Sequence, residues 1–342
     1  MRGANVVELR NRLGMRISVM DEGATLLSCQ LPLRSGGSRE VVLGCADLAA
    51  YRAQNVYAGA IVGRFTNRIH NASYTYQGEQ VLLHANCAGH QLHGGPVGFD
   101  RRIWAITQQS DSQVTFSLVS PDGDQGFPGE LSASVTYALG DALTLRVRME
   151  ARVNRPCPVG LTQHAYFNLN GDFGSETSSC LDHHLRVDGA YWLSADDALS
   201  MRELRHVEGT GLDFRSRRLL SDAIKGDPAL SRIGGIDHSL SLDPAARSSG
   251  SPCVLLESAD ERVRMTLCTD QPAVQLFTGM NLGKLTSRDG LPYRNNTGIA
   301  IEPQFIPNSP NRSVCEPYSP NCFLTPERTW TSTNVYRFYC DE

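Results

Sequence analysis

Apolar side chains recur at every second position over much of the chain. Successive side chains of a β-strand point to opposite faces, so this alternation is typical of strands with one buried face. Turn-forming residues, as at 121–124, separate the runs. The clearest runs lie at 13–19, 143–151, 263–267 and 274–277. The chain is therefore expected to be built mainly of β-strands.

Helical patterns are scarce by comparison. Residues 219–230 are expected to carry one short helix, and residues 245–252 are expected to form a hairpin loop. No internal repeat, low-complexity tract or Pro/Ser-rich linker divides the sequence. Residues 1–342 are therefore predicted to form a single domain of the all-β class, with one large antiparallel architecture.

The composition indicates a globular protein with a substantial core, since 41% of the 342 residues are hydrophobic and 20% are charged. The formal net charge of -4 gives no basic excess to neutralise phosphates, which argues against a nucleic-acid partner. Lys225 and Lys284 are the only lysines in the sequence. A Schiff-base mechanism or a phosphate-binding P-loop therefore has very few candidate residues.

The N-terminal residues and the cysteines bear on the cellular location. Charged and polar groups interrupt every apolar run near the N-terminus, so no signal peptide is expected. No stretch approaches the ~20 uninterrupted apolar residues that a transmembrane helix needs. The ten cysteines are scattered without a C-x-x-C pair and are expected to be reduced and mostly buried. These features predict a cytoplasmic protein with no membrane partner.

Polar residues gather in five short segments surrounded by strand-like sequence. In the third segment, a strand would place four polar side chains on one face, which is costly unless they bind something or each other. Those four are Thr162, His164, Tyr166 and Asn168. In the fifth, Glu302 lies within an apolar strand, where a carboxylate is disfavoured unless it is paired or functional. The five segments are 63–69, 91–104, 161–169, 235–238 and 299–305.

Some of these segments also have purely structural interpretations. Residues 63–69 equally suit an arginine-rich surface strand, and the glycines after His93 suit a tight turn. A metal site made by His84, His90 and His93 lacks the carboxylate or cysteine that would complete a zinc-binding spacing.

Other enzyme classes lack their motifs. No G-x-S-x-G elbow occurs, and no G-x-G-x-x-G follows a strand, which disfavours a serine hydrolase and a dinucleotide-binding enzyme. The pair His183 and His184 and the charged run 215–218 are expected to be solvated surface.

Taken in order, the polar segments resemble the aldose 1-epimerase, or galactose mutarotase, family over nearly the whole chain. Any one motif is weak, but six in the same order are specific. Residues 63–69 are similar to the family's G-R-x-x-N-R-I element, 92–104 to its L-H-G-G element, 126–129 to its G-[FY]-P-G turn, 164–169 to its H-x-Y-F-N-L strand and 235–238 to its G-[IV]-D-H turn, and Gln275 and Glu302 complete the set.

The resemblance implies a galactose mutarotase-like β-sandwich that binds a monosaccharide in a cleft on one sheet face, with no metal and no cofactor. It implies that Glu302 is the general base for the C1 hydroxyl and that His164 is the general acid for the ring oxygen. The residues implied to hold the remaining hydroxyls are Asn67, Arg68, His93, Tyr166, Asp237 and Gln275.

Ring opening removes one proton and adds another with no redox change, so an acid–base pair is sufficient. Ordinary pKa values of about 6.5 for histidine and about 4.3 for glutamate would leave each group near neutral pH in the state that its role requires. Departures from the common family pattern, such as Gln163 and Pro303, leave the sugar open among galactose, glucose, xylose, arabinose and fucose.

Three other functions fit parts of the pattern. A glycoside hydrolase or lyase would need a second carboxylate near Glu302, and Asp237 is the obvious candidate. An epimerase of sugar phosphates would need extra basic residues at the pocket. A non-catalytic sugar-binding domain would have no need of both His164 and Glu302. The oligomeric state, monomer or homodimer, is left open.

Overall fold

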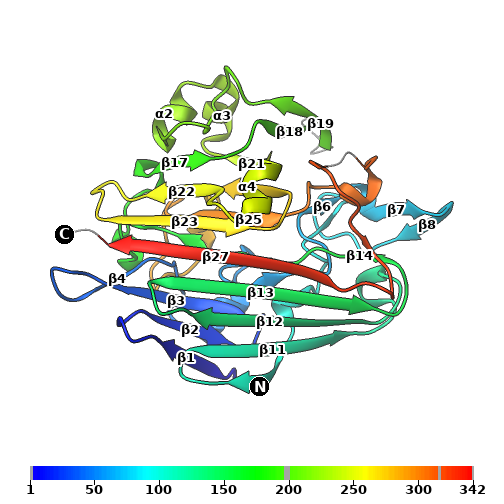
Figure 1. The fold of residues 1–342 in the computed structure, drawn as a ribbon, viewed down its shortest axis with the longest axis horizontal. Coiled ribbons are helices and arrows are strands. Elements are labelled where there is room, and N and C mark those ends of the chain that lie inside the picture. Colours follow the sequence, from blue (N-terminus) through cyan, green and yellow to red (C-terminus); the bar gives the residue numbers. More distant parts are fainter. Residues whose placement is uncertain (1–2, 196–200, 315–316, 341–342) are drawn as a thin grey trace.

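The largest element of the fold is a nine-stranded antiparallel sheet. The computed structural model describes residues 3–195, 201–314 and 317–340. The sheet faces the viewer in Figure 1, and its long central strands run across the molecule. In spatial order its strands are β10 (Ala105–Gln109), β11 (Gln113–Ser120), β12 (Leu131–Leu139), β13 (Thr144–Val153), β27 (Trp330–Cys340), β23 (Val263–Thr269), β22 (Val254–Glu257), β17 (His184–Val187) and β20 (Arg218–Leu219).

A six-stranded antiparallel sheet forms the second layer. Its strand β25 lies behind β22 and β23 in Figure 1. In spatial order its strands are β16 (Tyr166–Phe167), β25 (Ile299–Gln304), β24 (Ala273–Phe277), β21 (Asp237–Ser241), β18 (Tyr191–Ala195) and β19 (Met201–His206).

Smaller sheets, four short α-helices and seven single-turn 3₁₀-helices complete the described part. A four-stranded sheet contains β1 (Val6–Arg10), β2 (Arg16–Met20), β3 (Thr25–Pro32) and β4 (Ser38–Glu40). Two-stranded sheets pair β5 (Ile61–Val62) with β15 (Thr162–Gln163), β6 (Arg68–Ile69) with β9 (Gln91–Leu92), β7 (Ser73–Tyr76) with β8 (Glu79–Leu82), and β14 (Cys157–Pro158) with β26 (Phe323–Leu324). The α-helices are α1 (Leu48–Ala53), α2 (Leu220–Lys225), α3 (Pro228–Ile233) and α4 (Pro244–Ser249).

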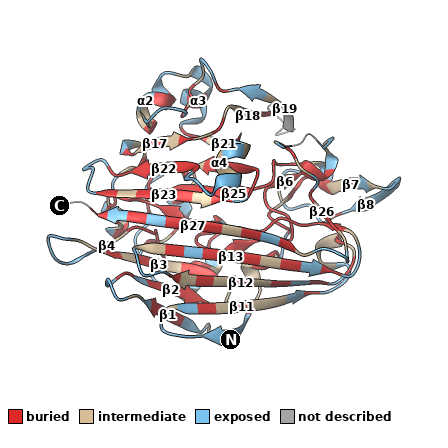
Figure 2. Ribbon diagram, in the orientation of Figure 1, coloured by how far each residue is buried: buried red, intermediate tan, exposed pale blue. Residues whose placement is uncertain are grey.

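The core lies between the two large sheets. Burial alternates along β12, β13 and β27, as the banding of these strands in Figure 2 shows. Met265 and Leu267 of the nine-stranded sheet belong to the same buried cluster as Leu276 and Ile301 of the six-stranded sheet. The four predicted strand runs all lie in or next to strands, and the predicted all-β sandwich is confirmed.

The alternation of side chains along a strand also determines which residues lie on the face of the six-stranded sheet that points away from the core. Leu276 and Ile301 point into the core, so their neighbours in sequence, Gln275 and Glu302, point the opposite way. Those two residues are register partners on β24 and β25. The outer face of the six-stranded sheet therefore carries polar side chains side by side.

One expectation about local structure is confirmed and another was wrong. The short helix expected at 219–230 is α2, and a second helix follows it, because Asp227 caps α3 and Pro228 occupies its first turn. The hairpin loop expected at 245–252 contains α4, capped by Asp243 and ended by Gly250. This segment joins β21 to β22, which lie in different sheets, so no hairpin can form there.

The expectation that His183 is solvated was also wrong. Its side chain is fully buried, its Nε2 accepts a hydrogen bond from the Leu169 amide at 2.8 Å, and its Nδ1 lies 3.0 Å from the Cys180 carbonyl oxygen. Burial lowers its pKa to about 4. By contrast, Arg215 and Arg217 in the run 215–218 are exposed, as expected.

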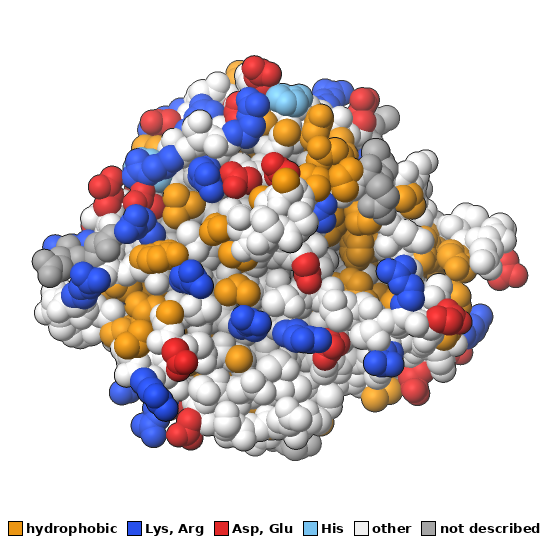
Figure 3. Space-filling view, in the orientation of Figure 1, with side chains coloured by type: hydrophobic (Ala, Val, Ile, Leu, Met, Phe, Trp, Pro, Cys, Tyr) orange, Lys and Arg blue, Asp and Glu red, His pale blue; other side chains and the backbone are white. Residues whose placement is uncertain are grey.

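The face shown in Figure 3 has basic and acidic side chains interspersed, and the basic ones do not gather into one region. The nine described cysteines are all free thiols, and Cys315 lies outside the described residues. Over the described ranges, no helix combines the length and the apolar character needed to cross a membrane.

Candidate active site

A polar pocket of about 280 Å³ opens on the outer face of the six-stranded sheet. All eight predicted catalytic and sugar-binding residues line it, although they come from six separate parts of the chain. A larger hollow of about 530 Å³ near α2 and α3 holds none of them. The pocket is lined by Asn55, Val56, Tyr57, Asn67, Arg68, Leu92, His93, His164, Tyr166, Asp237, Gln275, Phe277, Met280, Asn281 and Glu302.

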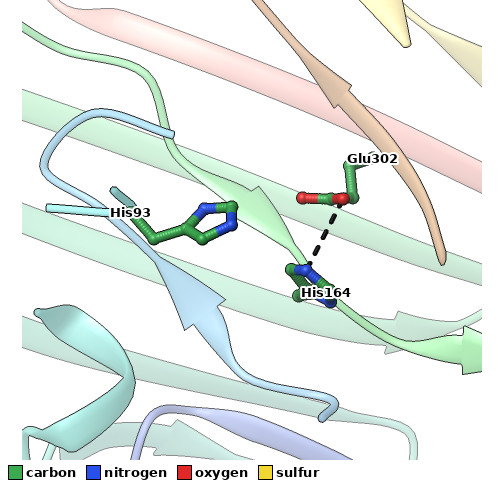
Figure 4. Close-up of side chains that lie close together, drawn as sticks. All are labelled: His93, His164 and Glu302. Carbon is green, nitrogen blue, oxygen red and sulfur yellow. Dashed lines mark ion pairs between the residues drawn. The ribbon is translucent and has the colours of Figure 1, made fainter. Parts of the chain in front are cut away.

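His164 and Glu302 face each other at the pocket. His164 Nε2 lies 3.6 Å from Glu302 Oε1, and the two residues are only 3% and 2% exposed. Figure 4 shows them pointing toward one another, with His93 opening onto the same space. His164 Nδ1 and Glu302 Oε2 are buried without a hydrogen-bond partner among the described residues. A buried, incompletely paired carboxylate and imidazole are typical of a catalytic pair.

The protonation of this pair differs from the expectation based on ordinary pKa values. Burial lowers the pKa of His164 to about 4. Burial, reinforced by the charge of Asp237, raises the pKa of Glu302 well above its usual value, against the opposing effect of Arg68. Each group thus favours its neutral form, because neither charge is solvated. The pair holds one proton between its two members at intermediate pH, and its apparent pKa values belong to the pair.

His93 is a neutral hydrogen-bond donor. Its Nδ1 accepts the Asn67 backbone N–H at 3.2 Å, so the ring hydrogen is on Nε2. Its pKa is lowered well below the usual value by burial, by His164 and by Arg68. The following turn needs glycine, because at Gly94 φ is +89° and a Cβ atom would lie 1.8 Å from the Gly63 carbonyl oxygen.

Three residues of the pocket have the donor atoms of a metal site. Ligand atoms of His93, His164 and Glu302 lie within 4.8 Å of one another. A metal at either ring nitrogen of His93 would have to displace the Asn67 hydrogen bond or the proton that this bond places on Nε2. The cluster therefore does not fit a resident metal. The set His84, His90 and His93 is not brought together as a ligand group within the described ranges, and His90 Nδ1 instead accepts the Asn71 amide at 3.0 Å.

Asp237 and Gln275 form the polar side of the pocket next to Glu302. Gln275 Nε2 donates to Asp237 Oδ1 at 2.6 Å, which leaves Gln275 Oε1 buried without a partner among the described residues. Asn67 and Arg68 line the pocket together, and Asn67 Oδ1 accepts the Arg68 backbone N–H at 2.8 Å. Carboxylate, amide and guanidinium groups are suited to binding sugar hydroxyls.

The expected strand carrying four polar residues on one face is only half right. It is two short strands, β15 and β16, interrupted at His164 and Ala165. Of the four, His164 and Tyr166 line the pocket. The Tyr166 hydroxyl donates to the Val56 carbonyl at 2.9 Å, so its ring rather than its hydrogen faces the ligand space. Asn168 instead ties loops together by donating to the Ser178 and Thr297 carbonyls.

The surface-strand interpretation of residues 63–69 is wrong for Arg64. That side chain is 2% exposed and makes its hydrogen bonds inside the protein. Tyr57, Phe277 and Met280 also line the pocket but were not predicted. Phe277 ends β24 and resembles any aromatic strand residue, whereas Tyr57 and Met280 lie outside the strands and have no polar motif beside them.

Comparisons with known proteins agree with this geometry. The family model described as Aldose 1-epimerase matches residues 5–337. The Aldose 1-epimerase of Escherichia coli (strain K12) is 40% identical over 338 residues, covering 98% of this chain and 95% of the relative. The Galactose mutarotase of Homo sapiens is 32% identical over 326 residues, covering 95% and 91%. A solved aldose epimerase homologue from C. elegans superposes with a TM-score of 0.88 at 27% identity, covering 99% of this chain and 100% of that one.

Proposed function

The chain belongs to the aldose 1-epimerase family, and on this premise we propose that the pocket interconverts the α and β anomers of a free aldose by acid–base catalysis. One observation carries the assignment of roles. His164 and Glu302 are both buried, face each other across 3.6 Å, and open onto a pocket lined by hydrogen-bonding side chains. We assign Glu302 as the general base and His164 as the general acid.

The reaction involves the two oxygens bonded to C1 of the sugar, which are the C1 hydroxyl and the ring oxygen. Glu302 removes the proton of the C1 hydroxyl while His164 protonates the ring oxygen, and the bond from C1 to the ring oxygen breaks. The open aldehyde rotates about the C1–C2 bond. The ring then closes on the other face of the carbonyl, with Glu302 returning its proton and His164 accepting one. The enzyme ends in its starting state.

The protonation of the pair is compatible with these roles. The reactive arrangement has Glu302 as carboxylate and His164 as imidazolium, which is a proton tautomer of the neutral pair. Because the two forms hold the same number of protons, moving between them requires only a transfer across the 3.6 Å contact and no exchange with bulk water.

The remaining polar residues position the sugar in this proposal. His93 donates from Nε2, Asp237 accepts, and Gln275 presents its unpaired carbonyl oxygen. Asn67 and Arg68 bind from the strand pair next to His93. Tyr166 provides a ring face. These contacts orient the sugar so that C1 lies between the acid and the base, which is the main way an enzyme lowers the entropic part of a barrier.

The pocket favours an uncharged sugar. Arg68 is the only lysine or arginine among the described residues that line it, and Arg68 already interacts with Glu302 and His93. A phosphate would want further basic partners. Relatives named Galactose mutarotase make galactose the first substrate to test.

We also propose that residues 1–342 form one domain and that the enzyme works in the cytoplasm. Support for one domain comes from β27, which pairs with both β13 and β23 and so joins distant parts of the chain. Support for a reducing compartment comes from the nine free cysteines.

Polarimetry tests the activity. Freshly dissolved α-galactose, α-glucose and α-xylose should reach their final optical rotation sooner with enzyme, with the end point unchanged. Glu302→Gln and His164→Asn should each lower the rate on the order of 10²-fold or more. Glu79→Gln on β8 and His206→Asn on β19 are exposed matched controls and should keep full activity.

A hydrolase would behave differently. Release of nitrophenol from a nitrophenyl galactoside, without acceleration of mutarotation, would reject the epimerase activity in favour of a two-carboxylate mechanism with Asp237. Full activity in a folded Glu302→Gln or His164→Asn variant would reject the assigned roles.

A further inference from the structure

Tyr57 is part of an aromatic enclosure around the acid. Its ring centroid lies 4.6 Å from that of His93 and 5.8 Å from that of His164, and the planes of Tyr57 and His164 are inclined by only 34°. Tyr166 lies 5.1 Å from His164 on another side. The imidazole of His164 therefore packs against three rings, those of Tyr57, His93 and Tyr166.

The backbone holds Tyr57 at a fixed place relative to His164. Gly59 N donates to the His164 carbonyl, and His164 N donates to the Ala60 carbonyl, each at 2.9 Å. Ala60 N closes a turn onto the Tyr57 carbonyl at 3.0 Å. Tyr57 itself has φ of +59°, a left-handed conformation that is uncommon for an aromatic residue and is retained at a cost. The strained turn is what directs the tyrosine ring toward the pocket.

The groups that face His164 are few. Glu302 is the carboxylate at 3.6 Å, and the rings of Tyr57, His93 and Tyr166 pack around the imidazole. Arg68 and Asp237 act on the neighbours, with Arg68 affecting His93 and both affecting Glu302. Among the described residues, Glu302 is therefore the only anion in contact, and the other stabilisation available to an imidazolium here comes from aromatic rings.

We propose that Tyr57 is a positioning residue that favours the imidazolium form of His164 through the face of its ring. A cation within about 6 Å of an aromatic centroid is attracted by the ring quadrupole, and more strongly when water is excluded. This inference rests on the proposed function, since it concerns the tautomer of the pair in which the carboxylate is the base and the imidazolium is the acid.

The Tyr57 hydroxyl is compatible with this role. Burial and the nearby Asp100 raise its pKa to about 12, so the phenol stays protonated and the ring stays neutral. A phenolate would attract the imidazolium by charge, which would make the ring face irrelevant. The role therefore needs the ring and not the hydroxyl.

Two substitutions at one position separate ring from hydroxyl. Tyr57→Phe should keep the mutarotation rate within about twofold. Tyr57→Leu keeps apolar bulk without a π face and should lower kcat by about 3- to 30-fold. The pKa of His164, followed by the NMR titration of its Cε1 proton, should fall by about half a pH unit or more in Tyr57→Leu. Tyr76→Leu, on β7 away from the pocket, is the matched control and should change neither quantity.

The sign of the pKa change separates this role from simple packing. If the ring served only to exclude water, its loss would hydrate His164 and raise the pKa, and that result would overturn the proposal. An equal loss of activity in Tyr57→Phe and Tyr57→Leu would also overturn it, because the hydroxyl would then be the important group. Should Tyr57→Leu fail to fold, 4-fluorophenylalanine at position 57 keeps the shape, weakens the ring face, and should lower both quantities relative to Tyr57→Phe.

The NMR titration does not depend on catalysis. If the wild-type protein failed to accelerate mutarotation, the proposed function would be rejected, whereas the effect of the ring on the pKa of His164 would still be measured.

Discussion

Replacing Arg64 with methionine tests a prediction about stability. Arg64 uses all five of its N–H donors within the protein. Its Nε donates to Ser120 Oγ at 2.9 Å, one terminal nitrogen donates to the carbonyls of Pro128 and Gly129 at 3.2 and 2.8 Å, and the other donates to those of Ser120 and Pro121 at 2.9 and 2.7 Å. The guanidinium therefore joins the residues before β6 to the loop between β11 and β12.

The expected magnitude follows from what the substitution leaves behind. The bonds to Ser120 and Gly129 are fully buried, whereas those to Pro121 and Pro128 are partly buried and their carbonyls can turn to water. Three buried acceptors without donors would cost about 1–3 kcal/mol each. Methionine fills part of the space and removes the cost of burying a charge. We expect Arg64→Met to lower the free energy of unfolding by about 3–5 kcal/mol.

Urea denaturation followed by tryptophan fluorescence measures this loss. Arg148→Met is the matched control, because Arg148 is exposed on β13 and pairs with Glu150 on the surface. Its substitution should change the free energy of unfolding by less than about 0.5 kcal/mol. Arg64→Lys keeps the charge but offers a compact group with three donors, so it should recover only part of the loss.

A loss below about 1 kcal/mol in Arg64→Met would refute the reasoning, because water would then replace the guanidinium at every acceptor. So would equal losses in Arg64→Met and Arg148→Met, since burial would then have no bearing on the cost.

Three further predictions concern the pocket. The profile of kcat/KM against pH should be bell-shaped. As pH falls through about 4, a second proton binds to the His164–Glu302 pair and the base is lost. As pH rises through the raised pKa of Glu302, the proton shared with His164 leaves and the acid is lost. Asp237→Asn removes a charge that raises the pKa of Glu302, so the alkaline limb of that profile should move to lower pH while KM for the sugar rises; an unmoved limb would contradict the electrostatic argument. In Gly94→Ala the new Cβ would lie 1.8 Å from a backbone oxygen, so the free energy of unfolding measured by thermal denaturation should fall by more than about 2 kcal/mol. Gly123→Ala is the control, because φ there is +78° but nothing lies within 4 Å, and it should lower this free energy by about 1 kcal/mol.

Strands and pocket residues were predictable because each leaves a local mark on the sequence. Alternation identified the region of β13 and of β23, since half of their side chains must be apolar. Glu302 was conspicuous because a carboxylate interrupts an otherwise apolar strand. The order of the polar motifs then brought Asn67, His164 and Gln275 into one proposed site, and the structure places all three around one pocket.

What escaped prediction depends on contacts between segments far apart in sequence. Arg64 and His183 resemble surface residues until their partners, some 56 and 14 positions away, are known. The protonation of His164 depends on enclosure by rings from other parts of the chain, and that enclosure, rather than the ordinary pKa of histidine, sets its charge. Tyr57 has no neighbouring pattern that distinguishes it from a core tyrosine.

The position of β27 has a consequence for biosynthesis. It is the last strand of the nine-stranded sheet to leave the ribosome, yet it lies in the middle, between β13 and β23. Until it arrives, the two halves of the sheet each expose an unpaired edge, which is a template for aggregation. A nascent chain that has not yet reached residue 330 therefore exposes two unpaired strand edges, on β13 and β23, where the folded protein has a continuous sheet. The nine-stranded sheet can close only after residues 330–340 have been synthesised, and chaperones that cover exposed strand edges protect the chain until then.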